Sequence, residues 1–156
     1  MKKIPLPHGK FTLVDDEDFE YLSQWKWHSH ERGYPRRTEY RNGKCFRYFR
    51  MSRVIMRVRP GEEVDHINRN PLDNRRKNLR VASTSQNQAN RIILSNNTSG
   101  FKGVSWHKTS GKWSAYIGFQ GKQYHLGVFS DIKDAARAYN TAAEGFYNEF
   151  AVLNKI

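Results

Sequence analysis

One stretch in the middle of the chain restricts the fold most, because turn-forming and apolar residues follow one another there at short intervals. A Pro-Gly turn precedes residues 64–67, which fit a short strand, and residues 70–74 (NPLDN) have the composition of a loop. Residues 79–82 fit a second strand, and residues 83–94 fit a helix that begins at a serine cap. The segment therefore predicts the order strand, long loop, strand, helix.

Four polar residues recur through this segment. Asp65 and His66 lie at the end of the first strand, Asn78 precedes the second strand, and Asn87 lies on the helix. Hydrolysis of a phosphodiester needs an activated water and a cation that stabilises charge on the phosphate and the departing oxygen. Taken singly, the histidine would be a structural or surface residue and each asparagine a cap or a solvated amide. Together, at these intervals, the four residues can build a one-metal site that cuts phosphodiesters.

Each of these residues has a role to which its chemistry is suited. His66 would be the general base, because an imidazole titrates near neutral pH. Asp65 is its neighbour, so both side chains reach one phosphate only if the strand twists or ends there. Asn87 would add a neutral oxygen ligand, and such hard ligands suit Mg²⁺ or Mn²⁺, one ion per site. Asn78 would hold the loop and orient His66.

The charge of the chain indicates the class of partner. Lysine and arginine number 27 against 15 acidic residues, a net charge of +12, and such a field concentrates polyanions. Nucleic acid is the first candidate and an anionic membrane the second. No apolar run approaches the ~20 residues that span a bilayer, and the start shows no secretory signal pattern. Cys45 is the single cysteine, which excludes an intrachain disulfide and a multi-thiolate zinc site, so we expect an intracellular, reducing location.

The first 58 residues mix aromatic and basic side chains. Asn42-Gly43 predicts a two-residue hairpin turn, and residues 51–58 fit either a strand or a short helix. Basic hairpins with interleaved aromatics can follow phosphates, although a solvated basic face over an aromatic core explains the aromatics equally well. The DNA contacts predicted before residue 95 are Arg36, Arg37, Arg75, Arg76, Lys77 and Arg80.

The last third of the chain reads as a small α+β unit. Residues 95–100 (SNNTSG) are small and polar, as in a linker. Residues 103–106, 112–119 and 123–129 fit three strands, and a helix capped by Ser130 or Asp131 extends to about residue 146. One helix packed on three strands makes a complete unit.

The segment VDHIN…LDNRR…NLR…SQNQ…N over residues 64–90 resembles the HNH endonucleases of phage and homing type. The resemblance implies a two-stranded hairpin and a helix around one divalent metal, the ββα-metal fold. It makes Asp65 and Asn87 metal ligands, His66 the general base and Asn78 the structural asparagine. Many members have histidine where this chain has Asn87, and asparagine variants occur.

Residues 98–154 resemble the plant APETALA/ethylene-response-factor DNA-binding domain, through KGV, GKW, AYI, LGVF and AARAY. The resemblance implies that the sheet lies in the major groove of DNA, which admits β-structure. Ser105, His107 and Gly118 stand at or near positions where the plant domains have base-reading arginines. A purely structural alternative makes Trp113, Ile117 and Phe129 core residues. The residues predicted to lie on the exposed face are Lys102, Trp106, Lys108, Trp113, Tyr116, Gln120, Lys122 and Tyr124.

Taken together, the sequence predicts an α+β protein with four parts. These are an N-terminal β-rich DNA-contacting segment (1–58), an HNH ββα-metal core (59–94), a linker (95–100) and a DNA-binding module of plant type (101–156). The expected function is a metal-dependent endonuclease on double-stranded DNA, of homing or phage type, in the cytoplasm of a bacterial or phage-infected cell. A monomer that nicks is the simplest case, and a double-strand cut would need a dimer on DNA or a second event. The alternatives are a non-catalytic DNA-binding protein with a decayed nuclease core, and a nuclease acting on RNA.

Overall fold

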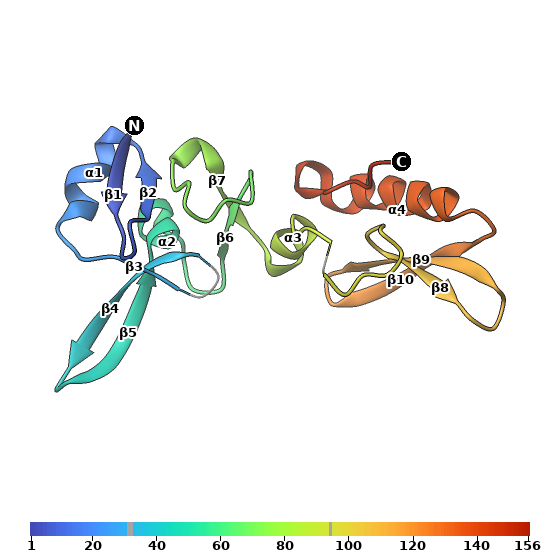
Figure 1. Ribbon diagram of the computed structural model, residues 1–156, viewed down its shortest axis with the longest axis horizontal. Coiled ribbons are helices and arrows are strands. Elements are labelled where there is room, and N and C mark those ends of the chain that lie inside the picture. Colours follow the sequence, from blue (N-terminus) through green and yellow to red (C-terminus); the bar gives the residue numbers. More distant parts are fainter. Residues whose placement is uncertain (31–32, 94) are drawn as a thin grey trace. The chain divides into compact units, whose positions relative to one another are not determined.

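The computed structural model describes residues 1–30, 33–93 and 95–156. The chain divides into two compact units, Met1–Ser83 and Thr84–Ile156. Both units contain helices and antiparallel strands, so the predicted α+β class is confirmed (Figure 1). None of the helices in these described ranges is long and apolar enough to cross a membrane.

The first unit begins with an antiparallel pair and a helix. Strand β1 (Lys2–Pro5) pairs with β2 (Phe11–Val14), with Lys2 opposite Val14. Helix α1 (Asp16–Ser23) follows directly, and its first turn carries Asp16, Glu17 and Asp18. Acidic side chains stabilise a helix N-terminus, because the exposed backbone N–H groups give that end a partial positive charge.

A long hairpin comes next. Strand β3 (His28–Ser29) pairs with β4 (Pro35–Arg41), which pairs with β5 (Lys44–Arg50). Between β4 and β5, Asn42 and Gly43 have φ of 49° and 73°, and two positive φ values are typical of the tight turn that suits strand twist. The hairpin predicted at Asn42-Gly43 is therefore confirmed.

A helix and a second hairpin complete the first unit. Residues 51–58, for which strand and helix were both open, form helix α2 (Met51–Met56), and it ends where Arg57 adopts a left-handed conformation. Strand β6 (Glu63–His66) pairs with β7 (Leu79–Ala82), and the short helix η1 (Arg76–Asn78) precedes β7. The strand, long loop and second strand predicted here are confirmed.

One hydrophobic core serves the whole first unit. Leu22, Met51, Ile55 and Leu79 are all buried in it, so residues on both sides of position 59 contribute. Backbone hydrogen bonds also join β2 to the long loop, from Leu13 N to Leu72 O and from Asn74 N to Leu13 O, both 2.8 Å. The N-terminal residues thus support the loop between β6 and β7.

The second unit holds the remaining elements. Helix α3 (Thr84–Ala89) precedes an antiparallel sheet of β8 (Val104–His107), β9 (Lys112–Phe119) and β10 (Lys122–Phe129), with β9 in the centre. Helix α4 (Ile132–Tyr147) contacts all three strands, and the short helix η2 (Asn148–Phe150) follows it. Asp131 caps α4 by accepting a hydrogen bond from Lys133 N at 2.6 Å.

Helix α3 is shorter than the helix predicted over residues 83–94, of which Leu94 lies outside the described residues. The carbonyls of Ala89 and Arg91 accept hydrogen bonds from the Lys102 ammonium group. A side-chain cation therefore satisfies backbone acceptors that a longer helix would have bonded internally.

Gly103 allows the sheet of the second unit to approach α4. Its φ is +73°, and a Cβ there would collide with the Tyr139 ring and the Tyr116 carbonyl. Gly111 has φ +61° but open space around it, so it is a matched control. We expect Gly111→Ala to cost about 1 kcal/mol from the backbone alone, and Gly103→Ala to cost a further ~1–3 kcal/mol from the collision. Urea denaturation of both variants measures the difference, and equal losses would contradict this packing.

Candidate active site

The β6–β7 hairpin carries the first two predicted site residues. In its register Asp65 is opposite Arg80 and His66 is opposite Leu79. Both residues are buried, with 4% and 5% of their surfaces exposed. Their side chains leave the strand on opposite faces, but β6 ends at His66, which relaxes that alternation.

Asn78 holds the long loop at its base. Its Oδ1 accepts a hydrogen bond from Asn68 N at 2.9 Å, and its Nδ2 donates to Asp73 O at 2.7 Å. Its carbonyl also accepts from Ile67 N at 2.9 Å. Since Ile67 and Asn68 directly follow His66, these bonds fix the backbone beside the imidazole.

Asn74 orients the His66 ring. The Nε2 atom of His66 lies 3.2 Å from Asn74 Oδ1, and the Asn74 amide nitrogen donates to Thr12 Oγ1 and Pro71 O. The amide oxygen therefore faces the ring, so Nε2 carries the proton and donates it. This leaves the lone pair of the neutral ring on Nδ1.

Burial sets the charge of this histidine. Desolvation lowers the pKa of His66 below its ordinary value, against the opposing effects of the Asn74 hydrogen bond and of the Asp65 and Asp73 carboxylates. A lowered pKa keeps the imidazole neutral near pH 7, which is the form that can accept a proton. The Tyr34 ring also contacts His66 edge-on, with centroids 5.6 Å apart.

Arg80 neutralises the buried Asp65 carboxylate. Its Nε and a terminal nitrogen both lie 2.9 Å from Asp65 Oδ2, and the side chains are only 14% and 5% exposed. Arg80 was predicted to contact DNA phosphate, whereas in this structure it pairs across the strands with the predicted metal ligand.

Two more of the predicted DNA contacts also lie in ion pairs. Arg75 donates two hydrogen bonds to the Asp73 carboxylate, from Nε to Oδ1 at 2.7 Å and from a terminal nitrogen to Oδ2 at 2.6 Å. Arg76 pairs with Asp18 at 2.6 Å and with Glu17 at 2.8 Å, and thus joins η1 to α1. Lys77, the middle residue of η1, is exposed.

The ion pair at Asp73 leads to a pH-dependent stability. Hydrogen bonds from Arg75, with smaller help from Asn68, hold the pKa of Asp73 below its ordinary 3.8. A lowered pKa adds stability that is fully present above pH 3.8 and is lost as pH falls through the folded-state pKa. We expect Asp73→Asn to lower the urea midpoint at pH 6 and to differ less from wild type at pH 3. Glu20→Gln, exposed on α1, is the control, and a loss independent of pH would contradict the assignment.

The predicted metal ligands have the chemistry that a divalent cation needs. Asp65 offers an anionic oxygen and Asn87 a neutral one, and such hard donors fit Mg²⁺ or Mn²⁺. Across the described ranges, His, Cys, Asp and Glu side chains form no group of three that could hold a metal. Asn87 lies on α3 in the second unit, so its pairing with Asp65 stays a prediction.

The sheet of the second unit has one side that packs against α4. The register pairs Trp106 with Trp113, and Tyr124 with Ile117. These residues lie on the side facing α4, because Trp113 packs against the core and Tyr124 contacts Phe146 of that helix. Trp113 is thus a core-side residue, as the structural alternative held. The two tryptophans contact each other edge-on at 4.9 Å. Trp106 and Tyr124 are still 49% and 38% exposed, so the predicted exposure was wrong for Trp113 but not for these two residues.

The opposite face of this sheet follows from the same register. Tyr116 belongs to it and pairs with His125, at a ring distance of 4.9 Å. Lys122 pairs with Phe119, whose ring stacks on Phe146 of α4, so this lysine leaves β10 on the covered side. The remaining predicted contacts lie in other settings: Lys102 on the α3 carbonyls, Lys108 exposed between β8 and β9, and Gln120 in the turn before β10.

Comparisons with known proteins support the motif. Residues 57–89 match the family model described as HNH endonuclease. Protein 3.8 of Escherichia phage T7 is 35% identical over 91 residues, which cover 58% of this chain and 74% of that protein. The chain belongs to the HNH endonuclease family.

The matched HNH segment runs from the end of α2 to the end of α3 and contains Asp65, His66, Asn78 and Asn87. A protein named as an uncharacterized HNH endonuclease, from Acanthamoeba polyphaga mimivirus, is 28% identical over 148 residues, 95% of this chain and 76% of that protein. An AP2-like ethylene-responsive transcription factor of Arabidopsis thaliana is 39% identical over 57 residues, which are 36% of this chain and 12% of that protein. This last match is partial and gives only weak support to a DNA-binding module of that type.

Sequence reasoning missed Asn74 and Thr12, the two residues that orient His66. Asn74 is part of the NPLDN loop, where asparagine is explained as a turn former. Thr12 lies 62 residues from Asn74 in sequence, so no local pattern links them.

Proposed function

We propose that this protein is a metal-dependent endonuclease that nicks double-stranded DNA through the HNH segment. The observation that carries the proposal is a buried, neutral His66 whose Nε2 is bonded to Asn74, beside a buried carboxylate, in a segment that matches the HNH family. A buried histidine oriented by a second polar side chain is a common arrangement for proton transfer in enzymes.

His66 acts as the general base in the proposed reaction. Its Nδ1 accepts a proton from water as the water oxygen bonds to the scissile phosphorus and the bond to the 3′ oxygen breaks. The leaving oxygen takes a proton from solvent, which gives a 5′-phosphate and a 3′-hydroxyl. Nε2 does not serve as the base, because it already carries a proton, which it donates to Asn74 in a hydrogen bond.

Asp65 and Asn87 are the proposed ligands of one Mg²⁺ or Mn²⁺ ion. The bound ion would stabilise charge on the phosphate and the departing oxygen. Since Arg80 neutralises Asp65 in this structure, the guanidinium has to share or release that carboxylate when a cation binds. Asn78 keeps its role as the residue that holds the loop behind His66.

DNA contacts are proposed for basic residues in both units. In the first unit Arg36 and Lys77 are the main candidates. The other predicted arginines there have partners already: three are in ion pairs, and the guanidinium of Arg37 lies 4.5 and 4.1 Å from the Trp25 and Phe49 rings. In the second unit the sheet face with Tyr116 is the proposed DNA-facing side, and Lys108 lies in a turn beside it. Plant-type sequence preference is not transferred, because base-reading arginines are missing from that face.

The Asp65–Arg80 ion pair favours one rival, a DNA-binding protein whose nuclease core no longer holds metal. Supercoiled plasmid incubated with the protein and Mg²⁺ or Mn²⁺, with EDTA as the control, separates the two. Nicked circles that form only with the metal support the nuclease. DNA binding without nicking supports the rival, and preferential cutting of competing RNA would support an RNA nuclease instead.

A further inference from the structure

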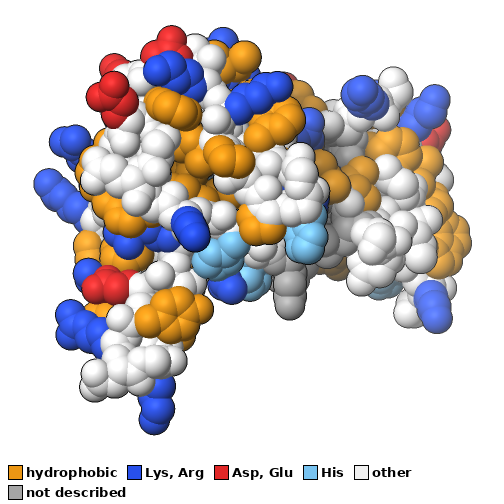
Figure 2. Space-filling view, turned by 60° about the vertical axis from the view of Figure 1, so that its left-hand side comes forward, with side chains coloured by type: hydrophobic (Ala, Val, Ile, Leu, Met, Phe, Trp, Pro, Cys, Tyr) orange, Lys and Arg blue, Asp and Glu red, His pale blue; other side chains and the backbone are white. Residues whose placement is uncertain are grey.

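The β4–β5 hairpin has two faces of different chemistry. Residues that pair across the strands lie on the same face, so Arg36 and Arg50 share one face of the hairpin, and Arg37 and Phe49 share the other. The register shifts by one residue after Glu39. In Figure 1 the hairpin extends away from the other elements of the first unit, and in Figure 2 Lys and Arg side chains lie beside hydrophobic ones along it.

One face, here called the phenylalanine face, places its arginines against aromatic rings or a carboxylate. It comprises Arg37, Glu39, Arg41, Lys44, Phe46, Arg47 and Phe49. Arg41 lies 3.9 Å from the Phe46 ring, and Arg47 lies 4.6 Å from the Phe49 ring. Arg47 also forms an ion pair with Glu39 at 2.7 Å. These guanidinium groups are already covered by rings or neutralised by a carboxylate.

The other face, here called the tyrosine face, has no acidic residue among its paired positions: Arg36, Thr38, Tyr40, Cys45, Tyr48 and Arg50. Its guanidinium groups lie farther from the rings, Arg36 at 5.7 Å from Tyr48 and Arg50 at 5.4 Å from Tyr34. Tyr48 is 58% exposed. His28 on β3 accepts a hydrogen bond from Arg36 Nε at 3.2 Å, which orients that side chain.

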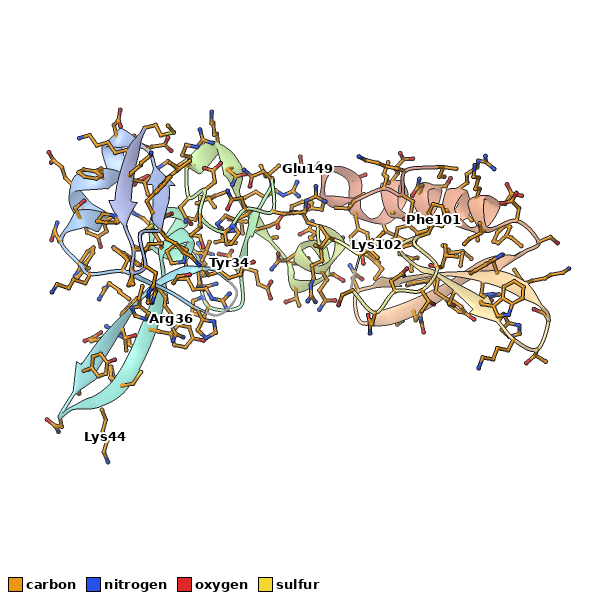
Figure 3. The ribbon with its side chains drawn as sticks, in the orientation of Figure 1. Tyr34, Arg36, Lys44, Phe101, Lys102 and Glu149 are labelled. Carbon is orange, nitrogen blue, oxygen red and sulfur yellow. The ribbon has the colours of Figure 1, made fainter. Side chains whose placement is uncertain are left out.

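The tyrosine face continues to the candidate base. Tyr34 contacts Arg50 on one side and the His66 ring on the other, with ring centroids 5.6 Å apart. Figure 3 shows Tyr34 and Arg36 near the base of the hairpin and Lys44 at its tip. A row of arginine and tyrosine side chains thus runs from the exposed hairpin to His66.

We propose that the tyrosine face, through Arg36, Tyr48 and Arg50 and continued by Tyr34, binds the backbone of duplex DNA and leads the strand to be cut to His66. The inference rests on the proposed function and adds the surface that places the substrate. A two-stranded ribbon fits the major groove. Arginines there, half-buried at Arg36 and exposed at Arg50, can form charge-assisted hydrogen bonds with phosphates, and such contacts fix the register of a protein on DNA. The phenylalanine face stiffens the ribbon and contributes no phosphate contact.

The two faces allow a matched test. Arg36→Gln/Arg50→Gln and Arg41→Gln/Arg47→Gln each remove two positive charges from the same hairpin. The affinity of the full-length variants for a labelled DNA duplex is measured by fluorescence anisotropy in EDTA, as a function of salt. Loss of two phosphate contacts lowers the slope of log affinity against log salt concentration by about 1.8. If the curves of variant and wild type meet at 1 M salt, the affinity at 0.1 M salt falls by up to about 60-fold. Only the tyrosine-face variant is expected to show this change.

Other outcomes overturn the inference. Equal losses in both variants would mean that net charge alone attracts DNA, and a larger loss in the phenylalanine-face variant would reverse the assignment. Thermal unfolding of each variant identifies any that fails to fold, and the single substitutions Arg50→Gln and Arg41→Gln then replace the pairs. A wild type that binds no DNA would overturn both proposals. A wild type that binds without cutting would overturn the proposed function and still leave the two faces to be compared.

Discussion

Replacement of His66 with alanine is expected to slow DNA nicking by about 10²- to 10⁴-fold, the usual contribution of a general base. The reason is the loss of the neutral imidazole that would take a proton from water at Nδ1. Binding of the DNA duplex should change little, because the ring is buried and its described contacts are with Asn74 and Tyr34. The rate of nicking of supercoiled plasmid with Mg²⁺, at saturating protein, measures the effect.

A histidine elsewhere provides the control. His8 is exposed in the turn between β1 and β2 with φ 62°, and asparagine tolerates that backbone conformation, so His8→Asn should nick at the wild-type rate. Equal nicking by wild type and His66→Ala would remove His66 from the mechanism. Thermal unfolding of His66→Ala has to be followed as well, because alanine leaves Asn74 Oδ1 without its ring partner.

The buried pair between Asp65 and Arg80 predicts the second large effect. Asp65→Leu leaves a guanidinium that is 14% exposed without its carboxylate, and such a change costs about 3–5 kcal/mol of folding free energy. The double variant Asp65→Leu/Arg80→Met removes both charges and should recover most of that loss. Urea denaturation of the wild type, both single variants and the double variant gives the coupling energy directly.

Nicking by the same variants tests the metal role of Asp65. The double variant should be folded but unable to nick, because it lacks the anionic oxygen that Asp65 offers to the metal. A double variant that nicks at the wild-type rate would exclude Asp65 as a ligand. A single variant as stable as the wild type would show that the ion pair contributes nothing to the fold.

Local chemistry explains which structural predictions agreed with the structure. The Asn42-Gly43 turn, the β6–β7 strands and the cap of α4 at Asp131 each depend on residues within a few positions of one another. Helix α3 was predicted too long, because its end depends on Lys102, which bonds the Ala89 and Arg91 carbonyls. The prediction that Trp113 lies on the exposed face of its sheet was wrong, because strand alternation defines two faces but not which one α4 covers.

For the candidate site, the sequence singled out Asp65, His66, Asn78 and Asn87 through residue chemistry and the resemblance to HNH enzymes. It did not give the partners of these residues. Arg80 faces Asp65 only through the register of β6 and β7, and Asn74 reaches His66 only through the folded loop that Thr12 supports.

The sequence by itself determined the order of the elements, the positive charge that suits a polyanion, and the identity of the motif residues. The tertiary structure alone decided which charges are neutralised, which nitrogen of His66 carries the proton, and which face of the β4–β5 hairpin keeps its arginines available. The physical reason is that backbone preference acts over a few residues. Hydrogen-bond and ion-pair partners are instead chosen by the packing of segments that are far apart in the chain.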